Sequence, residues 1–230
     1  MHAPLGALGL FLVVFVLISA IGADWWSTHE PNQINVRAAF ASPSLEHLLG
    51  TDQLGRDIFS RVLVGGQIAL KVSLISIGVA LLIGLALGLI AGFGPRWIDN
   101  ILMLLFDSVR SFPTVMFALA VVTLFGPSLE TIMIIVIVTQ IPIYGRMVRS
   151  QTLALKNSEF ILTEQAIGAG FFRIIFVHML PNVIGPLLIL ASMDIPFVIT
   201  IEAGLSFLGM GVRPPTPSWG TILNDGYSYI

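Results

Sequence analysis

Long uninterrupted runs of apolar residues dominate the pattern of hydrophobic and polar positions along this chain. A helix needs about 20 mostly apolar residues to cross the core of a bilayer. Segments of that kind lie within residues 1–23, 68–93, 98–125, 129–147 and 182–205. Prolines in the later segments do not exclude a span, because neighbouring helices can satisfy the carbonyls that proline leaves free. The pattern therefore predicts an all-α fold, a polytopic membrane helix bundle with five transmembrane helices.

The first apolar segment, residues 1–23, has two interpretations. A cleaved signal peptide has a basic region before a short apolar core. This segment lacks such a basic region, and its apolar core is long. We therefore favour a retained first transmembrane helix.

The composition supports lipid as the main solvent of the chain. Hydrophobic residues make up 56% and charged residues 10% of the sequence, whereas a soluble domain carries roughly 25% charged residues. The net charge of −2 gives no sign of nucleic-acid binding. Cysteine is absent, which excludes disulfides, thiol catalysis and cysteine metal sites.

Basic residues in the loops predict the orientation. The loop at 145–181 contains Arg146, Arg149, Lys156 and Arg173, against three arginines in the segment 24–67. Because basic residues favour the cytoplasm, we expect a cytoplasmic N-terminus, an extracytoplasmic segment at 24–67 and a cytoplasmic loop at 148–181. The remaining core at 68–230 would then end in an extracytoplasmic tail at 206–230.

The cytoplasmic loop at 148–181 is too short to form a domain with its own core. It is nevertheless rich in apolar residues: Phe160, Ile161, Leu162, Ile167, Phe171, Phe172, Ile174, Ile175 and Phe176. Gly168 and Gly170 permit a sharp exit from a short helix. The apolar face must contact the membrane surface or a partner protein, and composition alone favours interfacial lipid.

Two stretches of this loop resemble the "EAA" loop of binding-protein-dependent ABC permeases: residues 164–169 and residues 173–182. In that family the loop forms a coupling helix that docks on the cytoplasmic ATPase. Aligned on Gly168, the positions of the glutamate-alanine-alanine triplet hold Leu162, Thr163 and Glu164. The resemblance implies that ATPase coupling involves Glu164, Ala166, Gly168, Leu180 and Pro181.

Two further stretches narrow the resemblance. Residues 47–57 are similar to the outer segment of dipeptide, oligopeptide and nickel permeases, and residues 206–220 resemble the segment after their fifth core span. The family usually continues into one more span, which we expect this chain to lack. The resemblance implies the fold of a type I ABC importer permease, a transport subunit in the cell inner membrane. A nickel or glutathione importer subunit of the same family is the alternative to a peptide importer.

The resemblance also implies the partners. These are a second homologous permease subunit, two cytoplasmic ATP-binding subunits and an extracytoplasmic solute-binding protein, in addition to membrane lipid. Neither Lys71 nor Lys156 follows a glycine, so the chain has no phosphate-binding loop of its own. We therefore expect no bound cofactor and assign ATP hydrolysis to the partners.

Charged residues at membrane depth are candidates for lining the pathway, because each is costly there unless it is paired or hydrated. Asp107 and Arg110 are i,i+3 neighbours and can neutralise each other. Asp194 falls near the bilayer midplane, where Arg110 or Lys71 could pair with it. A role in the pathway and a structural pairing remain alternatives for Asp194.

Two local patterns predict packing. Asp52 and Arg56 are spaced i,i+4 in a predicted amphipathic interfacial helix that continues through Ile58. This helix could also contact the solute-delivering protein. Glycines at 84, 88 and 92 would let a second helix approach closely.

Two other classes of function are less favoured. A membrane-embedded enzyme needs catalytic groups that converge at membrane depth, but the histidines, at 2, 29, 47 and 178, lie outside the predicted spans. We therefore predict no catalytic residue and no metal ligand. A simple channel or scaffold would not need the coupling-type loop, and co-purification of an ATPase would exclude it.

Overall fold

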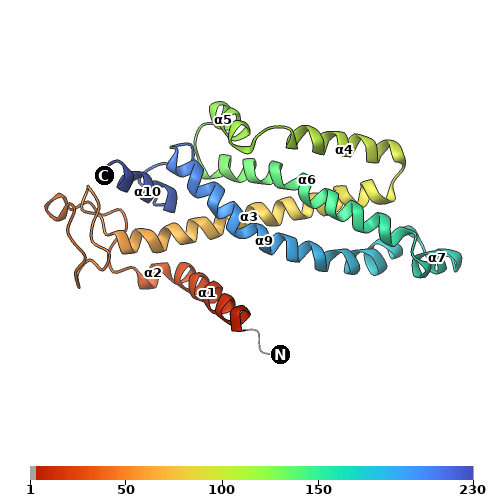
Figure 1. Cartoon of the computed structure of the whole chain (residues 1–230), viewed down its shortest axis with the longest axis horizontal. Helices are drawn as coiled ribbons and strands as arrows, with labels where there is room; N and C mark the ends of the chain where they lie inside the picture. Colours follow the sequence, from red (N-terminus) through yellow and green to blue (C-terminus); the bar gives the residue numbers. More distant parts are fainter. Residues whose placement is uncertain (1–3, 230) are drawn as a thin grey trace. The chain divides into compact units, whose positions relative to one another are not determined.

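The computed structural model describes residues 4–229, and its regular elements are all helical (Figure 1). No strand forms among these residues, although an isolated bridge joins Thr51 and Asp57. In chain order the elements are α1 Pro4–Ile21, α2 Ala23–Trp26, the 3₁₀ turn η1 Val36–Ala38, α3 Ile58–Phe93, α4 Arg96–Arg110, α5 Thr114–Phe125, α6 Leu129–Lys156, α7 Glu159–Ala166, α8 Phe171–Arg173, the π-helical turn η2 Ile174–Met179, α9 Leu180–Phe207 and α10 Trp219–Tyr227. The all-α prediction is confirmed.

Four helical segments of the described chain are long and apolar enough to cross a membrane: Pro4–Ile21, Ile58–Phe93, Leu129–Lys156 and Phe171–Phe207. A fifth span is reached if α4 and α5 are counted together. These two helices meet at an angle of 87°, so the predicted span 98–125 is not one straight helix. Pro113 lies in the break, where it has no N–H to donate and disfavours helical geometry at the preceding residue.

The predicted amphipathic helix around Asp52 and Arg56 is wrong in its first half. Residues 51–57 form turns, and α3 begins only at Ile58. The left-handed conformation of Gly55 (φ 70°) interrupts any helix there, and a side chain at this position would collide with the Asn35 carbonyl. Helix α3 also starts ten residues before the predicted span 68–93 and is 36 residues long.

The chain divides into two compact units, and the long helices α3, α6 and α9 contribute to both. The first unit comprises residues 1–73, 122–132 and 199–230. Within it, the indole N–H of Trp219 donates to the Val62 carbonyl at 2.9 Å. The Asn224 amide donates to the Phe207 carbonyl at 2.7 Å. These bonds attach α10 to the beginning of α3 and the end of α9.

The second unit comprises residues 74–121 and 133–198, and a close contact of α3 with α6 runs through it. A Cβ on Gly88 would lie 2.6 Å from the Gly145 carbonyl oxygen and 2.6 Å from the Val148 Cβ. Gly84 and Gly92 meet α6 at similar separations. The predicted packing role of this glycine stripe is therefore confirmed.

Substitution of Gly88 tests how much this contact contributes. We expect Gly88→Ala to lower the stability of the subunit in detergent by about 1–3 kcal/mol, because the added methyl group overpacks the contact. The midpoint of thermal unfolding measures the effect. Gly78 lies on the same helix, and a Cβ added there would meet no heavy atom within 4 Å, so Gly78→Ala is the matched control and should not destabilise. Equal midpoints for both variants would contradict the packing argument.

Candidate functional site

The loop between α6 and α9 folds around a small apolar cluster. Ile161 of α7, Ile174 and Met179 are buried together. Partly buried apolar residues that pack on them are Phe93, Leu155 and Ala169. The ends of α3 and α6 therefore supply the core that the loop is too short to form alone, and they hold α7 in a defined position.

A glycine turn ends α7. Gly168 has a φ of 87°, a left-handed conformation that favours glycine. Its N–H donates to the Gln165 carbonyl at 3.0 Å, and the Ala169 N–H donates to the Glu164 carbonyl at 2.9 Å. This pair of bonds is a Schellman motif, which caps the last carbonyls of the helix. It redirects the chain towards α9.

One contact between polar side chains connects α7 with the turn that precedes α9. The Glu164 carboxylate lies 3.5 Å from Nε2 of His178, and both side chains are about one-quarter exposed or less. Leu180 and Pro181 follow directly as the first residues of α9. This contact and the buried Met179 therefore connect α7 with the start of α9.

Apolar side chains of the same loop remain exposed. Ile167 and Phe172 are each 73% exposed, and Leu162 at the surface of α7 is 51% exposed. Aromatic rings also line an apolar groove beside α3, where Phe171 makes an edge contact with Phe93 at 5.2 Å. These surfaces can contact lipid or a partner protein.

Polar side chains meet where α6 and α9 face each other. Tyr144 is fully buried and Gln140 nearly so, and the Tyr144 side chain lies beside the Asp194 carboxylate. The Tyr144 hydroxyl and one Asp194 oxygen are buried without a well-formed hydrogen bond among the described residues. A neutral residue, and not Arg110, is thus the neighbour of Asp194.

The predicted pairing of Asp107 with Arg110 is wrong. The Asp107 carboxylate instead accepts a hydrogen bond from Arg146 of α6, and Arg110 is exposed. Asp99 forms a second link of this kind, in which Oδ2 accepts from Nη2 of Arg149 at 2.6 Å. The acids of α4 are therefore paired with α6, because the two helices pack side by side and Phe106 contacts Gly145.

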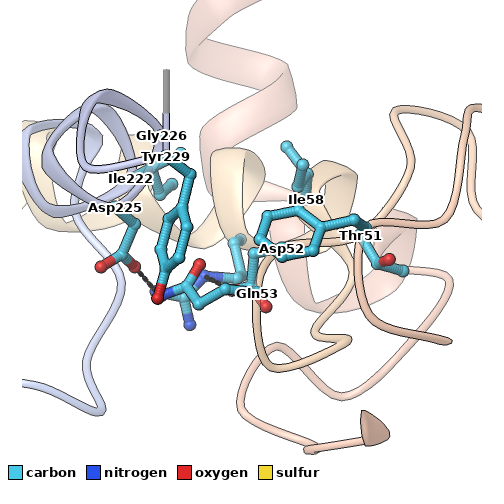
Figure 2. A pocket seen from close by; sticks show the side chains of 10 residues that line it. Thr51, Asp52, Gln53, Ile58, Ile222, Asp225, Gly226 and Tyr229 are labelled. Atoms are coloured by element: carbon cyan, nitrogen blue, oxygen red, sulfur yellow. Dashed lines mark ion pairs between the residues drawn. The ribbon is translucent and has the colours of Figure 1, made fainter. Parts of the chain in front are cut away.

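An ionic network joins the segment between α2 and α3 to α10. Arg56 binds Asp52 at 2.6 Å and Asp225 at 3.0 Å. Arg61 lies 3.7 Å from Asp52 and 3.8 Å from Asp225. Figure 2 shows Asp52 and Asp225 approaching from the two elements, with Tyr229 beside them. Both guanidinium groups are nearly buried, so each requires an anion.

Comparison with known proteins decides the family. Residues 84–230 match the family described as binding-protein-dependent transport system inner membrane components. The chain belongs to this family. It is a transport permease, a multi-pass protein of the inner membrane and a subunit of an ABC importer.

Curated relatives match the permease over nearly its whole length. The dipeptide transport system permease protein DppC of Alkalihalophilus pseudofirmus is 38% identical over 226 residues, which are 98% of this chain and 74% of the relative. A protein of Brucella suis named "putative peptide permease protein" is 37% identical over 220 residues, which are 96% of this chain and 73% of the relative.

The structure distributes the predicted site residues of the permease among several places. Glu164, Ala166 and Gly168 lie in or after α7, and Leu180 and Pro181 begin α9. Asp107, Arg110 and Asp194 do not form one cluster. Sequence reasoning missed Asp225, which lies 169 residues from its partner Arg56. Only the resemblance of residues 47–57 to a permease outer segment pointed to this region.

Removing the charge of Asp225 tests the ionic network of Arg56 and Arg61. We expect Asp225→Asn to lower the stability of the permease by about 1.5–3 kcal/mol, the range for a hydrogen bond to a charged group, because Arg56 and Arg61 then share Asp52 alone. The thermal unfolding midpoint reports this loss. Asp24 is an exposed acid of the same unit, so Asp24→Asn should leave the midpoint unchanged. A shift of the same size in both variants would refute the network.

Proposed function

We propose that this permease imports peptides or related small solutes and forms half of the translocation pathway beside a second homologous permease subunit. The observation that carries the proposal is the set of relatives named dipeptide or peptide permeases, 36–38% identical over 96–98% of the chain. An importer of nickel complexes or glutathione is the alternative within the same family.

Two cytoplasmic ATP-binding subunits drive transport in this proposal, and an extracytoplasmic solute-binding protein delivers the solute. The family description supports this division of labour, since it names a binding-protein-dependent system of which this chain is the membrane component. The permease itself contributes the pathway and the connection to the ATPases.

We assign the connection to α7 and the turn after it, with Glu164, Ala166, Gly168, Leu180 and Pro181 as the coupling residues. Three features support the assignment: the buried cluster that fixes α7, the exposed apolar residues around it, and the Glu164–His178 pair that leads to α9. An ATPase groove that receives the exposed face would move α9 when the ATPases close. Interfacial lipid is the alternative occupant of that face.

A pair of valine substitutions tests the coupling assignment. Gly168→Val forces a β-branched residue into the left-handed region, which costs at least about 1–2 kcal/mol locally. We expect the variant to insert normally but to recover several-fold less ATPase when the complex is purified. Gly170 has a φ of −68°, and a Cβ added there would enter open space, so Gly170→Val should recover the ATPase fully. Equal recovery with both variants would reject the assignment.

Asp194 is proposed to line the pathway beside Tyr144 and to favour solutes that carry a positive amino group. One buried Asp194 oxygen makes no well-formed hydrogen bond among the described residues, and the neighbouring Tyr144 is neutral, so a passing cation could interact with the carboxylate. Asp107 and Arg110 are also proposed to line the pathway, since both are exposed, although Asp107 is paired with Arg146.

Substitution of Asp194 distinguishes a role in transport from a role in stability. We expect Asp194→Asn to leave permease levels in the membrane normal and to reduce uptake several-fold, most strongly for cationic solutes. Tyr144→Phe is the control, since it removes the neighbouring hydroxyl but keeps the Asp194 carboxylate. This variant should therefore retain the preference for cationic solutes. Low membrane levels of Asp194→Asn would indicate a structural role, and unchanged uptake of all solutes would eliminate the pathway role.

A further inference from the structure

Three potential metal ligands converge in the outer segment of the permease. His29 follows α2, His47 lies in the loop after η1, and Asp57 directly precedes α3. Their ligand atoms all lie within 4.8 Å of one another. His47 Nδ1 is 2.9 Å and His29 Nδ1 is 3.8 Å from the same oxygen, Oδ1 of Asp57. All three residues belong to one compact unit.

The two carboxylate oxygens of Asp57 make different contacts. Oδ2 accepts hydrogen bonds from the backbone N–H and the hydroxyl of Ser60, each at 2.8 Å, and so caps the start of α3. Oδ1 faces the two imidazoles. The two hydrogen bonds from Ser60 hold the buried carboxylate in a fixed orientation, with Oδ1 towards the imidazoles.

The surroundings favour a cation at this position. The centroids of the two imidazole rings are 4.5 Å apart, so nitrogens of both rings can reach one ion. Two further acids, Glu30 and Glu46, line the hollow in front of the cluster. No lysine or arginine is found among the described residues that line it. Two imidazoles together with an excess of carboxylates suit a metal ion.

We infer that His29, His47 and Asp57 bind one divalent transition-metal ion of the Zn²⁺ class. Two imidazole nitrogens and one carboxylate oxygen form a ligand set that zinc accepts at about 2.0–2.2 Å, with a fourth position open to water. The observed separations need only small side-chain movements to reach that geometry. The bound ion would connect the segment between α2 and α3, which carries His29 and His47, to the start of α3. The sequence pattern did not indicate this site, because long loop stretches separate the three ligands.

Zinc binding to the purified full-length subunit in detergent tests the inference. Equilibrium dialysis against Zn²⁺, followed by elemental analysis, should give one ion per chain, and bound Zn²⁺ should raise the thermal unfolding midpoint. We expect His29→Gln to weaken binding at least about tenfold, because it removes one of three protein ligands. The backbone N–H of His29, which donates to Ser60 Oγ at 3.1 Å, remains in this variant, so the loop can keep its fold.

His178→Gln is the matched control, since it removes one imidazole outside the cluster. Full Zn²⁺ binding by this variant together with weakened binding by His29→Gln supports the site. The inference is overturned if the wild-type subunit binds no stoichiometric Zn²⁺, or if the two variants bind it equally, which would indicate adventitious binding. An unchanged midpoint in the presence of bound Zn²⁺ would refute the proposed tie between loop and helix.

Discussion

Lipid offers no hydrogen-bond partner to a peptide group, so every backbone N–H and C=O within the bilayer must be satisfied by the protein itself. Helices meet this requirement within each segment, and the regular elements of residues 4–229 are all helical. Most of the irregular backbone lies in the stretch between α2 and α3 and in the tail before α10. Ion pairs and side-chain hydrogen bonds hold both stretches, as Arg56 and Trp219 illustrate.

The same solvent removes the hydrophobic drive for helices to associate, so close packing must replace it. Within the second unit, α6 packs closely against two other helices. Gly88 of α3 meets the backbone of Gly145, and Gly145 also accommodates the ring of Phe106. The neighbouring position on α6 carries Tyr144, whose hydroxyl is buried beside Asp194. Small residues thus permit the close approach of α3 and α4 to α6.

Several charged side chains that are removed from water have an opposite charge beside them, which offsets the cost of burial. Arg56 and Arg61 share Asp52 and Asp225 in one unit. Asp99 pairs with Arg149 in the other. Of these links, only that of Arg56 with Asp52 is local in the chain. Ionic contacts therefore hold together segments that the chain itself leaves far apart.

Hydropathy and local chemistry are properties of short stretches, and for this reason the sequence by itself determined the membrane class, the all-α fold and the apolar character of the α6–α9 loop. It also indicated the turn at Gly168, whose left-handed conformation suits glycine. The motif resemblances led to the family that comparison confirms.

Tertiary structure alone decided which distant groups meet. The sequence pattern placed Asp107 beside Arg110, but the packing of α4 on α6 gives it Arg146 instead. The 87° bend between α4 and α5 and the early start of α3 are likewise absent from the hydropathy pattern. Asp225 and the cluster around Asp57 depend on loops whose course is set by turns and ion pairs. Such pairings arise from packing geometry, which no local window of sequence contains.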